Sequence, residues 1–330
     1  MIRLCQIGCG EHALGSHGPC QARYAAAHPG ALELVACADL DPGRAESYRA
    51  RFAFARAYAD PFAMIVAERP HAVVLVVPVE RTCEMGAALL ERGVPVLMEK
   101  PPGRTVAEVD RLIAAAGAGG GSGPPVPHQV AFNRRYAPLV RELRRRIESA
   151  PEPPQHLRYT MVRFDRRDPD FSITAIHGID AVRYLAGCDY AEVRFRYQEL
   201  PRLGPGVANL FLDAVMASGA TAHLSFCPVA GVVVERAEVH LHDHTFLLEV
   251  PMWAAFDAPG RLQHLERGAL REEILGRAGS APFEQGGFEA ELAAFLDDLQ
   301  AARFPSPDLR AARQSVAVAE AMRARAGRFG

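Results

Sequence analysis

The chain has 330 residues, of which 49% are hydrophobic, and a formal net charge of −2. This length can form two domains of ordinary size, and the small charge gives no general attraction to nucleic acids or membranes. No apolar run approaches the ~20 residues that span a bilayer. The seven cysteines are scattered without a CxxC pair, and the first residues read as a strand. We therefore expect a cytoplasmic protein without a signal peptide.

The first third of the chain alternates short apolar strands with helices. Asp41-Pro42 and Thr105 with Glu108 are typical N-caps and begin two of these helices. The alternation predicts a doubly wound parallel sheet. The expected strands are Ile2–Ile7, Leu32–Ala38, Ala72–Val77, Val94–Met98 and His128–Asn133, and the other expected helices are Pro19–Ala27 and Glu80–Arg92.

The pattern changes after a helix at Ala137–Glu148. Longer segments with alternating polarity predict an α+β domain with a large, open, mostly antiparallel sheet. We therefore expect a dinucleotide-binding domain at residues 1–134 and a substrate-binding and oligomerisation domain at residues 135–330. Gly117–Pro127 is predicted to be a surface loop, and Pro259–Gly287 shows little periodicity and is expected to be mobile. The expected strands are His156–Phe164, Glu192–Tyr197, Val207–Ala214, Thr221–Phe226, Val232–His242 and Thr245–Val250, and the helices are Ile173–Leu185, Phe288–Ala302 and Asp308–Ala324.

A glycine motif follows the first strand. Gly8-x-Gly10-x-x-Ala13 matches the dinucleotide fingerprint, in which the first glycine makes a tight turn and the second admits the pyrophosphate. The third, small residue lets helix and strand pack closely. Because the motif lies between a strand and a helix, it indicates dinucleotide binding rather than a simple turn.

Asp39 ends the second strand. Its carboxylate can accept hydrogen bonds from ribose hydroxyls and repel a 2′-phosphate, and Leu40 beside it offers no positive charge. This pattern favours NAD over NADP, although Arg44 keeps NADP as the alternative. Asp39 could instead be a turn or capping residue.

Lys100 is the only lysine among 37 basic residues of the Lys and Arg types. Where any positive charge suffices, this chain uses arginine, so the single lysine indicates a position that needs a compact ammonium group. Lys100 follows the fourth expected strand, and the carboxyl ends of such strands face the ligand crevice. We therefore place Lys100 at the active site.

The motifs together resemble those of the Gfo/Idh/MocA oxidoreductases, over essentially the whole chain. The more specific elements are Glu99-Lys100-Pro101 and His177-x-x-Asp180. The others are Gly8-Cys9-Gly10, His17, Ala38-Asp39-Leu40-Asp41-Pro42, Ala131-Phe132-Asn133-Arg134-Arg135-Tyr136-x-Pro138 and Phe288-x-x-Glu291-Leu292-x-x-Phe295.

The resemblance implies hydride transfer between a nicotinamide and a hydroxyl-bearing carbon of a sugar, cyclitol or nucleotide-sugar. Lys100 would contact the reacting hydroxyl, and a cis peptide would precede Pro101. The second-domain sheet would join subunits into a homodimer or homotetramer. We expect Pro78 and Glu99 at the cofactor, together with Gly8, Gly10, Ala13, Asp39 and Lys100, and we expect Arg134, Tyr136 and Asp180 at the substrate.

His177 is the expected general base, because an imidazole titrates near neutral pH. The family usually has an aspartate four residues before this histidine and a glycine two before it, where this chain has Ile173 and Ala175. Thr82 replaces a further family histidine. The alternatives are therefore a cofactor-binding sensor or partner subunit without turnover, or an enzyme that recycles a bound NAD. His177 could also be a structural histidine.

Two weaker patterns have open interpretations. His240-x-His242-x-His244 could place three imidazoles on one face, but it reads as a hairpin tip, and we expect no metal site. Several arginines could bind an anionic group on the substrate or lie on a solvated face. They are Arg134, Arg135, Arg163, Arg166 and Arg167.

Overall fold

The structure is a computed structural model that describes residues 1–253 and 255–330. The chain forms two compact units: residues 1–132 with 288–313, and residues 133–287 with 314–330. The sequence assigned residues 288–313 to the second domain. In the structure they join the first unit, because α9 (Phe288–Gln300) packs on α1 (Gly18–Ala27) and the Tyr24 hydroxyl donates to Asp297 Oδ1 at 2.8 Å.

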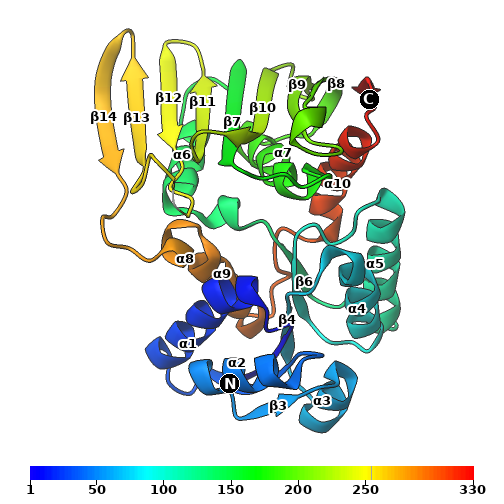
Figure 1. The fold of residues 1–330 in the computed structure, drawn as a ribbon. Coiled ribbons are helices and arrows are strands. Elements are labelled where there is room, and N and C mark those ends of the chain that lie inside the picture. Colours follow the sequence, from blue (N-terminus) through cyan, green and yellow to red (C-terminus); the bar gives the residue numbers. More distant parts are fainter. Residues whose placement is uncertain (254) are drawn as a thin grey trace. The chain divides into compact units, whose positions relative to one another are not determined.

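The first unit is built on a parallel six-stranded sheet, as the sequence predicted (Figure 1). The strand order is β3-β2-β1-β4-β5-β6, so the direction of winding reverses between β1 and β4, and ligands of such sheets bind at the carboxyl ends of the strands near this point. The strands are β1 (Ile2–Ile7), β2 (Leu32–Ala38), β3 (Arg56–Tyr58), β4 (Ala72–Leu75), β5 (Val96–Glu99) and β6 (His128–Ala131).

The helices of this unit confirm the predicted caps and correct one boundary. Asp41 accepts hydrogen bonds from the N–H groups of Gly43 and Arg44, and Thr105 and Glu108 form a capping box. The helix expected from Pro19 begins at Glu11 and includes a π-helical stretch, η1 (Ala13–His17), which polar residues and Gly15 concealed. Two further elements, β3 and α3 (Pro61–Glu68), were not predicted from the sequence. The other helices are α2 (Pro42–Phe52), α4 (Val79–Glu91) and α5 (Val106–Gly119), the last extending into the expected loop.

The second unit is built on a nine-stranded sheet of order β14-β13-β12-β11-β7-β10-β9-β8-β15. Only β7 and β10 pair in parallel, so the sheet is mostly antiparallel, as predicted. The strands are β7 (His156–Phe164), β8 (Tyr190–Glu199), β9 (Ala208–Met216), β10 (Thr221–Ala230), β11 (Val234–His240), β12 (His244–Glu249), β13 (Arg261–Glu266), β14 (Ala269–Leu275) and β15 (Arg328–Phe329).

The hairpin of β13 and β14 corrects the expectation for residues 259–287, which lacked a clear sequence pattern. Its residues are mostly half-buried or exposed, so few of them show the apolar alternation of a core strand. The remaining helices are η2 (Asn133–Tyr136), α6 (Pro138–Glu148), α7 (Ser172–Ala186), η3 (Pro201–Leu203) and α8 (Pro282–Gln285), and α10 (Leu309–Arg323) runs from the first unit into the second. None of the helices in the described residues is long and apolar enough to cross a membrane.

Candidate functional site

The glycine loop follows β1 and makes the turn that its motif predicted. Gly8 has a φ of +85°, and a Cβ there would lie 1.8 Å from the carbonyl oxygen of Val76. Only glycine fits at this point. A Cβ on Gly10 would have no atom within 4 Å, so the space beside this residue is open. The loop therefore leaves room for a ligand at the second glycine, next to the N-terminus of the following helix.

Asp39 connects the end of β2 to the glycine loop. Its Oδ2 accepts the N–H of Cys9 at 2.8 Å, and its Oδ1 accepts the N–H of Asp41 at 2.9 Å. Asp39 is thus a turn-forming residue, although a carboxylate can accept further hydrogen bonds. Leu40 is 86% exposed, and Arg44 lies 3.5 Å from Asp41 Oδ2 through its Nε.

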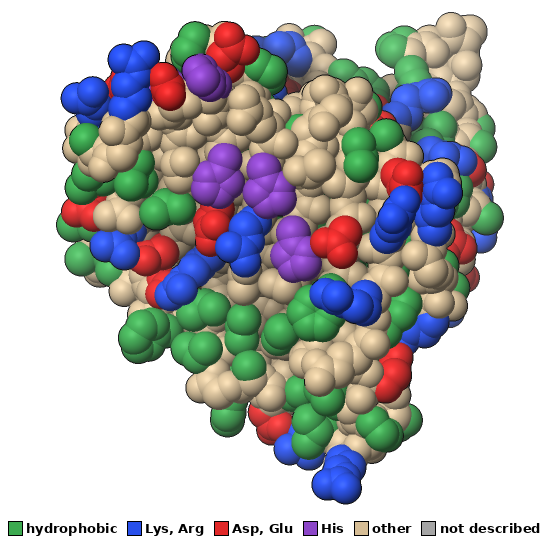
Figure 2. All heavy atoms as spheres, turned by 90° about the horizontal axis from the view of Figure 1, so that it is seen from above, with side chains coloured by type: hydrophobic (Ala, Val, Ile, Leu, Met, Phe, Trp, Pro, Cys, Tyr) green, Lys and Arg blue, Asp and Glu red, His purple; other side chains and the backbone are tan. Residues whose placement is uncertain are grey.

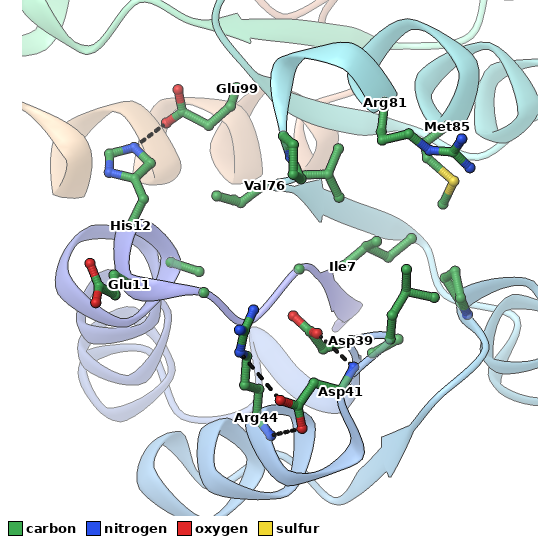
Figure 3. A pocket seen from close by; sticks show the side chains of 18 of the residues that line it. Ile7, Glu11, His12, Asp39, Asp41, Arg44, Val76, Arg81, Met85 and Glu99 are labelled. Atoms are coloured by element: carbon green, nitrogen blue, oxygen red, sulfur yellow. Dashed lines mark hydrogen bonds and ion pairs between the residues drawn. The ribbon is translucent and has the colours of Figure 1, made fainter. Parts of the chain in front are cut away.

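A cavity of about 880 Å³ opens at the carboxyl ends of these strands (Figure 3). It is lined by all seven residues that the sequence placed at the cofactor: Gly8, Gly10, Ala13, Asp39, Pro78, Glu99 and Lys100. The structure brings these residues together from the ends of four strands, β1, β2, β4 and β5, while their contact with a dinucleotide stays a prediction. Five other residues that line the cavity were not predicted from the sequence to do so: Glu11, His12, Val76, Arg81 and Met85. Their positions just after β1 and β4 were the available signal.

Glu99, at the end of β5, accepts hydrogen bonds from two histidines. His12 Nε2 and His17 Nε2 each lie 2.8 Å from Glu99 Oε1. Burial raises the pKa of Glu99, but the two imidazoles outweigh this effect and hold the pKa well below its usual value. Burial lowers the pKa of His17 by more than Glu99 raises it. At neutral pH the cluster therefore pairs a carboxylate with a neutral His17.

Lys100 is half-buried and lines the same cavity. Its backbone N–H donates to Glu99 Oε2 at 3.0 Å, so the Glu99 carboxylate joins the histidines to the backbone of the lysine. The Lys100–Pro101 peptide is cis, which confirms the expectation from the resemblance. The lysine therefore stands where the sequence placed it, at the carboxyl end of β5.

The second unit holds the expected base and substrate residues. His177 lies on α7 and is 6% exposed, and Ile173 precedes it by one turn. Asp180, on the same helix, accepts two hydrogen bonds of 2.7 Å from Arg135 and one of 3.1 Å from Ser315. The buried Asp180 carboxylate is thus part of a structural ion pair, and Tyr136 is half-buried in η2.

The arginines considered for an anionic substrate all have acidic partners. Arg134 and Arg163 both bind the fully buried carboxylate of Glu235, which also accepts the Tyr159 hydroxyl. These groups form a buried network in which one carboxylate pairs with two guanidinium groups. The remaining pairs are Arg135–Asp180, Arg166–Asp168 and Arg167–Asp165. The interpretation as an anion site is therefore weakened for these five residues.

The histidines near the β11–β12 hairpin have separate partners. His240 Nδ1 pairs with Thr245 at 3.0 Å, His244 Nδ1 pairs with His264 at 3.0 Å, and His242 is exposed at the tip. Figure 2 shows one face of the molecule, on which histidines gather among arginines and acidic side chains. Within the part of the chain that the structure describes, these three histidines do not form a group close enough to share an ion.

Comparison with known proteins identifies the first unit. Residues 2–121 match the model of the Gfo/Idh/MocA oxidoreductase family, which has an NAD-binding Rossmann fold. Over these residues the chain is similar to that family. This confirms the resemblance drawn from the motifs.

Among curated Gfo/Idh/MocA relatives, inositol 2-dehydrogenase 2 of Saccharopolyspora erythraea is 32% identical over 160 residues. The match covers 47% of this chain and 46% of that protein, so the chain spans about half the length of this relative.

Solved structures show the same fold over almost the whole chain. UDP-N-acetylglucosamine 3-dehydrogenase from Acidithiobacillus ferrooxidans has a TM-score of 0.81 and 22% identity, with 99% of this chain and 98% of that chain covered. Levoglucosan dehydrogenase in complex with NADH and L-sorbose has a TM-score of 0.83 and 20% identity, with 100% and 98% covered.

Proposed function

We propose that this chain is a dehydrogenase that uses NAD to transfer a hydride to or from a hydroxyl-bearing carbon of a sugar, cyclitol or nucleotide-sugar. The observation that carries the proposal is the common cavity of the seven residues expected at the cofactor. The matched family and the names of the relatives support the oxidoreductase class and the choice of polyhydroxylated substrates.

The residues of the first unit fit a dinucleotide. Gly10 leaves open space where a pyrophosphate can approach the backbone, and the helix that follows directs N–H groups and positive dipole toward it. The Asp39 carboxylate can bind ribose hydroxyls, and Leu40 offers a 2′-phosphate no charge. NAD is therefore preferred to NADP in this proposal. The bound nicotinamide would supply the carbon that accepts or donates the hydride.

The protein itself would position the substrate and move a proton. The Lys100 ammonium would contact the reacting hydroxyl and stabilise negative charge on its oxygen. Glu99 holds the backbone of Lys100 through the 3.0 Å hydrogen bond and so fixes where this side chain begins. In the second unit, His177 would accept the hydroxyl proton. We also propose a homodimer or homotetramer formed through the nine-stranded sheet.

The proposal is tested in two steps. Purified protein is first titrated with NADH and NADPH, and nucleotide fluorescence is followed. It is then screened with NAD against myo-inositol, levoglucosan and UDP-N-acetylglucosamine at several pH values, with Lys100→Arg as the inactive control. Nucleotide binding together with lysine-dependent NADH production supports the proposal. Tight NADH binding without turnover on a broad polyol screen would favour the sensor interpretation, for which Ile173 is the motivating residue.

A further inference from the structure

We call the residues His12, His17 and Glu99 the His–Glu cluster. Their side chains offer metal-ligand atoms that the proposed reaction does not require. Two imidazole nitrogens approach one carboxylate oxygen, each at 2.8 Å. The side-chain atoms that could bind a metal ion all lie within 4.8 Å of one another. Two histidines and one carboxylate are a common ligand set for transition-metal ions in proteins.

The π-helical stretch explains why the two histidines converge. In a regular α-helix, residues five apart point about 140° away from each other. Residues 13–17 form a π-helix, whose wider turn brings position i+5 over position i. His12 and His17 therefore lie on one side of the helix, with ring centroids 5.5 Å apart and planes at 82°. A π-helical turn of this kind often marks a functional site.

The surroundings of the cluster suit an ion with one open coordination position. His17 and Glu99 are buried, whereas the side chain of His12 is 42% exposed and can adjust. Ligand bonds of about 2.1 Å in a tetrahedral site require ligand atoms roughly 3.4 Å apart. The present nitrogen–oxygen separations would have to open by only about half an ångström. His12 and Glu99 also line the cavity, so solvent can reach the site.

We propose that His12, His17 and Glu99 bind one divalent cation of the Zn²⁺ class, with a water molecule as the remaining ligand. The inference does not depend on the proposed dehydrogenase activity, because it concerns a binding site in the nucleotide-free protein.

The test is calorimetric titration of the nucleotide-free full-length chain with ZnCl₂, together with the visible absorption spectrum after titration with Co²⁺. The wild type should bind one Zn²⁺ at this site and give the intense Co²⁺ bands of four- or five-coordinate geometry. His12→Phe keeps an aromatic ring beside Phe288 but removes a ligand, so it should weaken binding at least tenfold and abolish the bands. Glu99→Gln should have the same effect.

The matched control is His244→Asn, which removes a histidine from the His244–His264 pair in the other unit. It should leave the high-affinity binding and the Co²⁺ spectrum unchanged. Circular dichroism melting shows whether each variant folds, and His12→Asn serves as a second variant if His12→Phe does not. Wild-type protein without Zn²⁺ binding, unchanged binding in the folded His12 variants, or loss of binding in His244→Asn would overturn the proposal.

Discussion

The backbone N–H of Cys9, inside the glycine loop, donates a hydrogen bond of 2.8 Å to Oδ2 of Asp39 at the end of β2. The residue that the motif assigns to the ribose therefore also holds the loop that the motif assigns to the pyrophosphate. This double role affects how a substitution at Asp39 must be interpreted.

We predict that the wild type binds NADH more tightly than NADPH. Asp39→Ala should narrow this difference in binding free energy by about 1–3 kcal/mol, because charged hydrogen bonds are lost. Asp39→Ala should also weaken the binding of both nucleotides, because the Cys9 N–H loses its hydrogen-bond acceptor. Fluorescence titration measures both effects. Asp60→Ala is the control, since Asp60 also accepts hydrogen bonds from two backbone N–H groups, at the N-cap of α3, and does not line the cavity. Equal affinities of the wild type for the two nucleotides would contradict this prediction.

The two glycines of the loop should respond differently to alanine. Gly8→Ala should destabilise the protein by about 3 kcal/mol or more, because its Cβ would collide with the Val76 carbonyl at a positive φ. Gly10→Ala should change stability by less than about 1 kcal/mol but weaken NADH binding at least tenfold, by filling the open space. Thermal melting and NADH titration of both variants check this. Normal NADH affinity in Gly10→Ala would show that the pyrophosphate does not bind beside Gly10.

Lys100→Arg should abolish most turnover while NADH still binds. The variant keeps the positive charge but replaces a compact ammonium by a planar guanidinium, which cannot take the same position at a reacting hydroxyl. Arg81→Lys is the matched control, because Arg81 lines the same cavity and this substitution replaces a guanidinium by an ammonium group. Steady-state kinetics on a substrate found by screening give the answer. Near-normal turnover of Lys100→Arg would show that any cation serves at this position.

His177→Ala should lower turnover by roughly 10²–10⁴-fold with little change in NADH affinity, as expected for loss of a general base. Ile173→Asp places a carboxylate one turn before the histidine and should raise turnover if orientation of the imidazole limits the wild type. His223→Ala, on β10 of the same unit, is the control. If His177→Ala is as fast as the wild type, this histidine is structural.

The buried Glu235 network should make the stability of the second unit depend on pH. Burial raises the pKa of Glu235, but Arg134 and Arg163 outweigh it and hold the pKa at about 2, against 4.5 for an ordinary glutamate. Because the folded pKa is the lower one, this stabilisation is complete above about pH 4.5 and is lost as the pH falls toward 2. It amounts to roughly 3 kcal/mol.

The measurement is urea unfolding over this pH range, followed by fluorescence of Trp253, the single tryptophan, which lies in the second unit. Glu235→Gln should remove this part of the acid dependence and cost about 3–5 kcal/mol at neutral pH, because two buried guanidinium groups lose their counter-charge. Glu238 is a half-buried neighbour on β11, and Glu238→Gln should change neither the acid dependence nor the stability at neutral pH. If Glu235→Gln leaves the pH dependence of unfolding unchanged, Glu235 is not the group responsible for it.

The sequence by itself determined the features that depend on short-range chemistry. A positive φ at Gly8, the caps formed by Asp41 and Thr105, and the end of β2 at Asp39 each follow from residues within a few positions of one another. Alternating apolar segments likewise predicted the parallel sheet of the first unit. The single lysine could be placed because parallel strands present their carboxyl ends at one edge of the sheet.

Only the tertiary structure decided which distant groups meet. His17 and Glu99 are 82 positions apart, and the π-helical turn that joins His12 to them has no pattern that could be read from the sequence. Arg134 and Glu235 are 101 positions apart, so the charged run around Arg134 gave no sign of its buried partner. Charge pairing and ligand clustering depend on three-dimensional distance, which the spacing of residues along a chain does not specify beyond a single helix or strand.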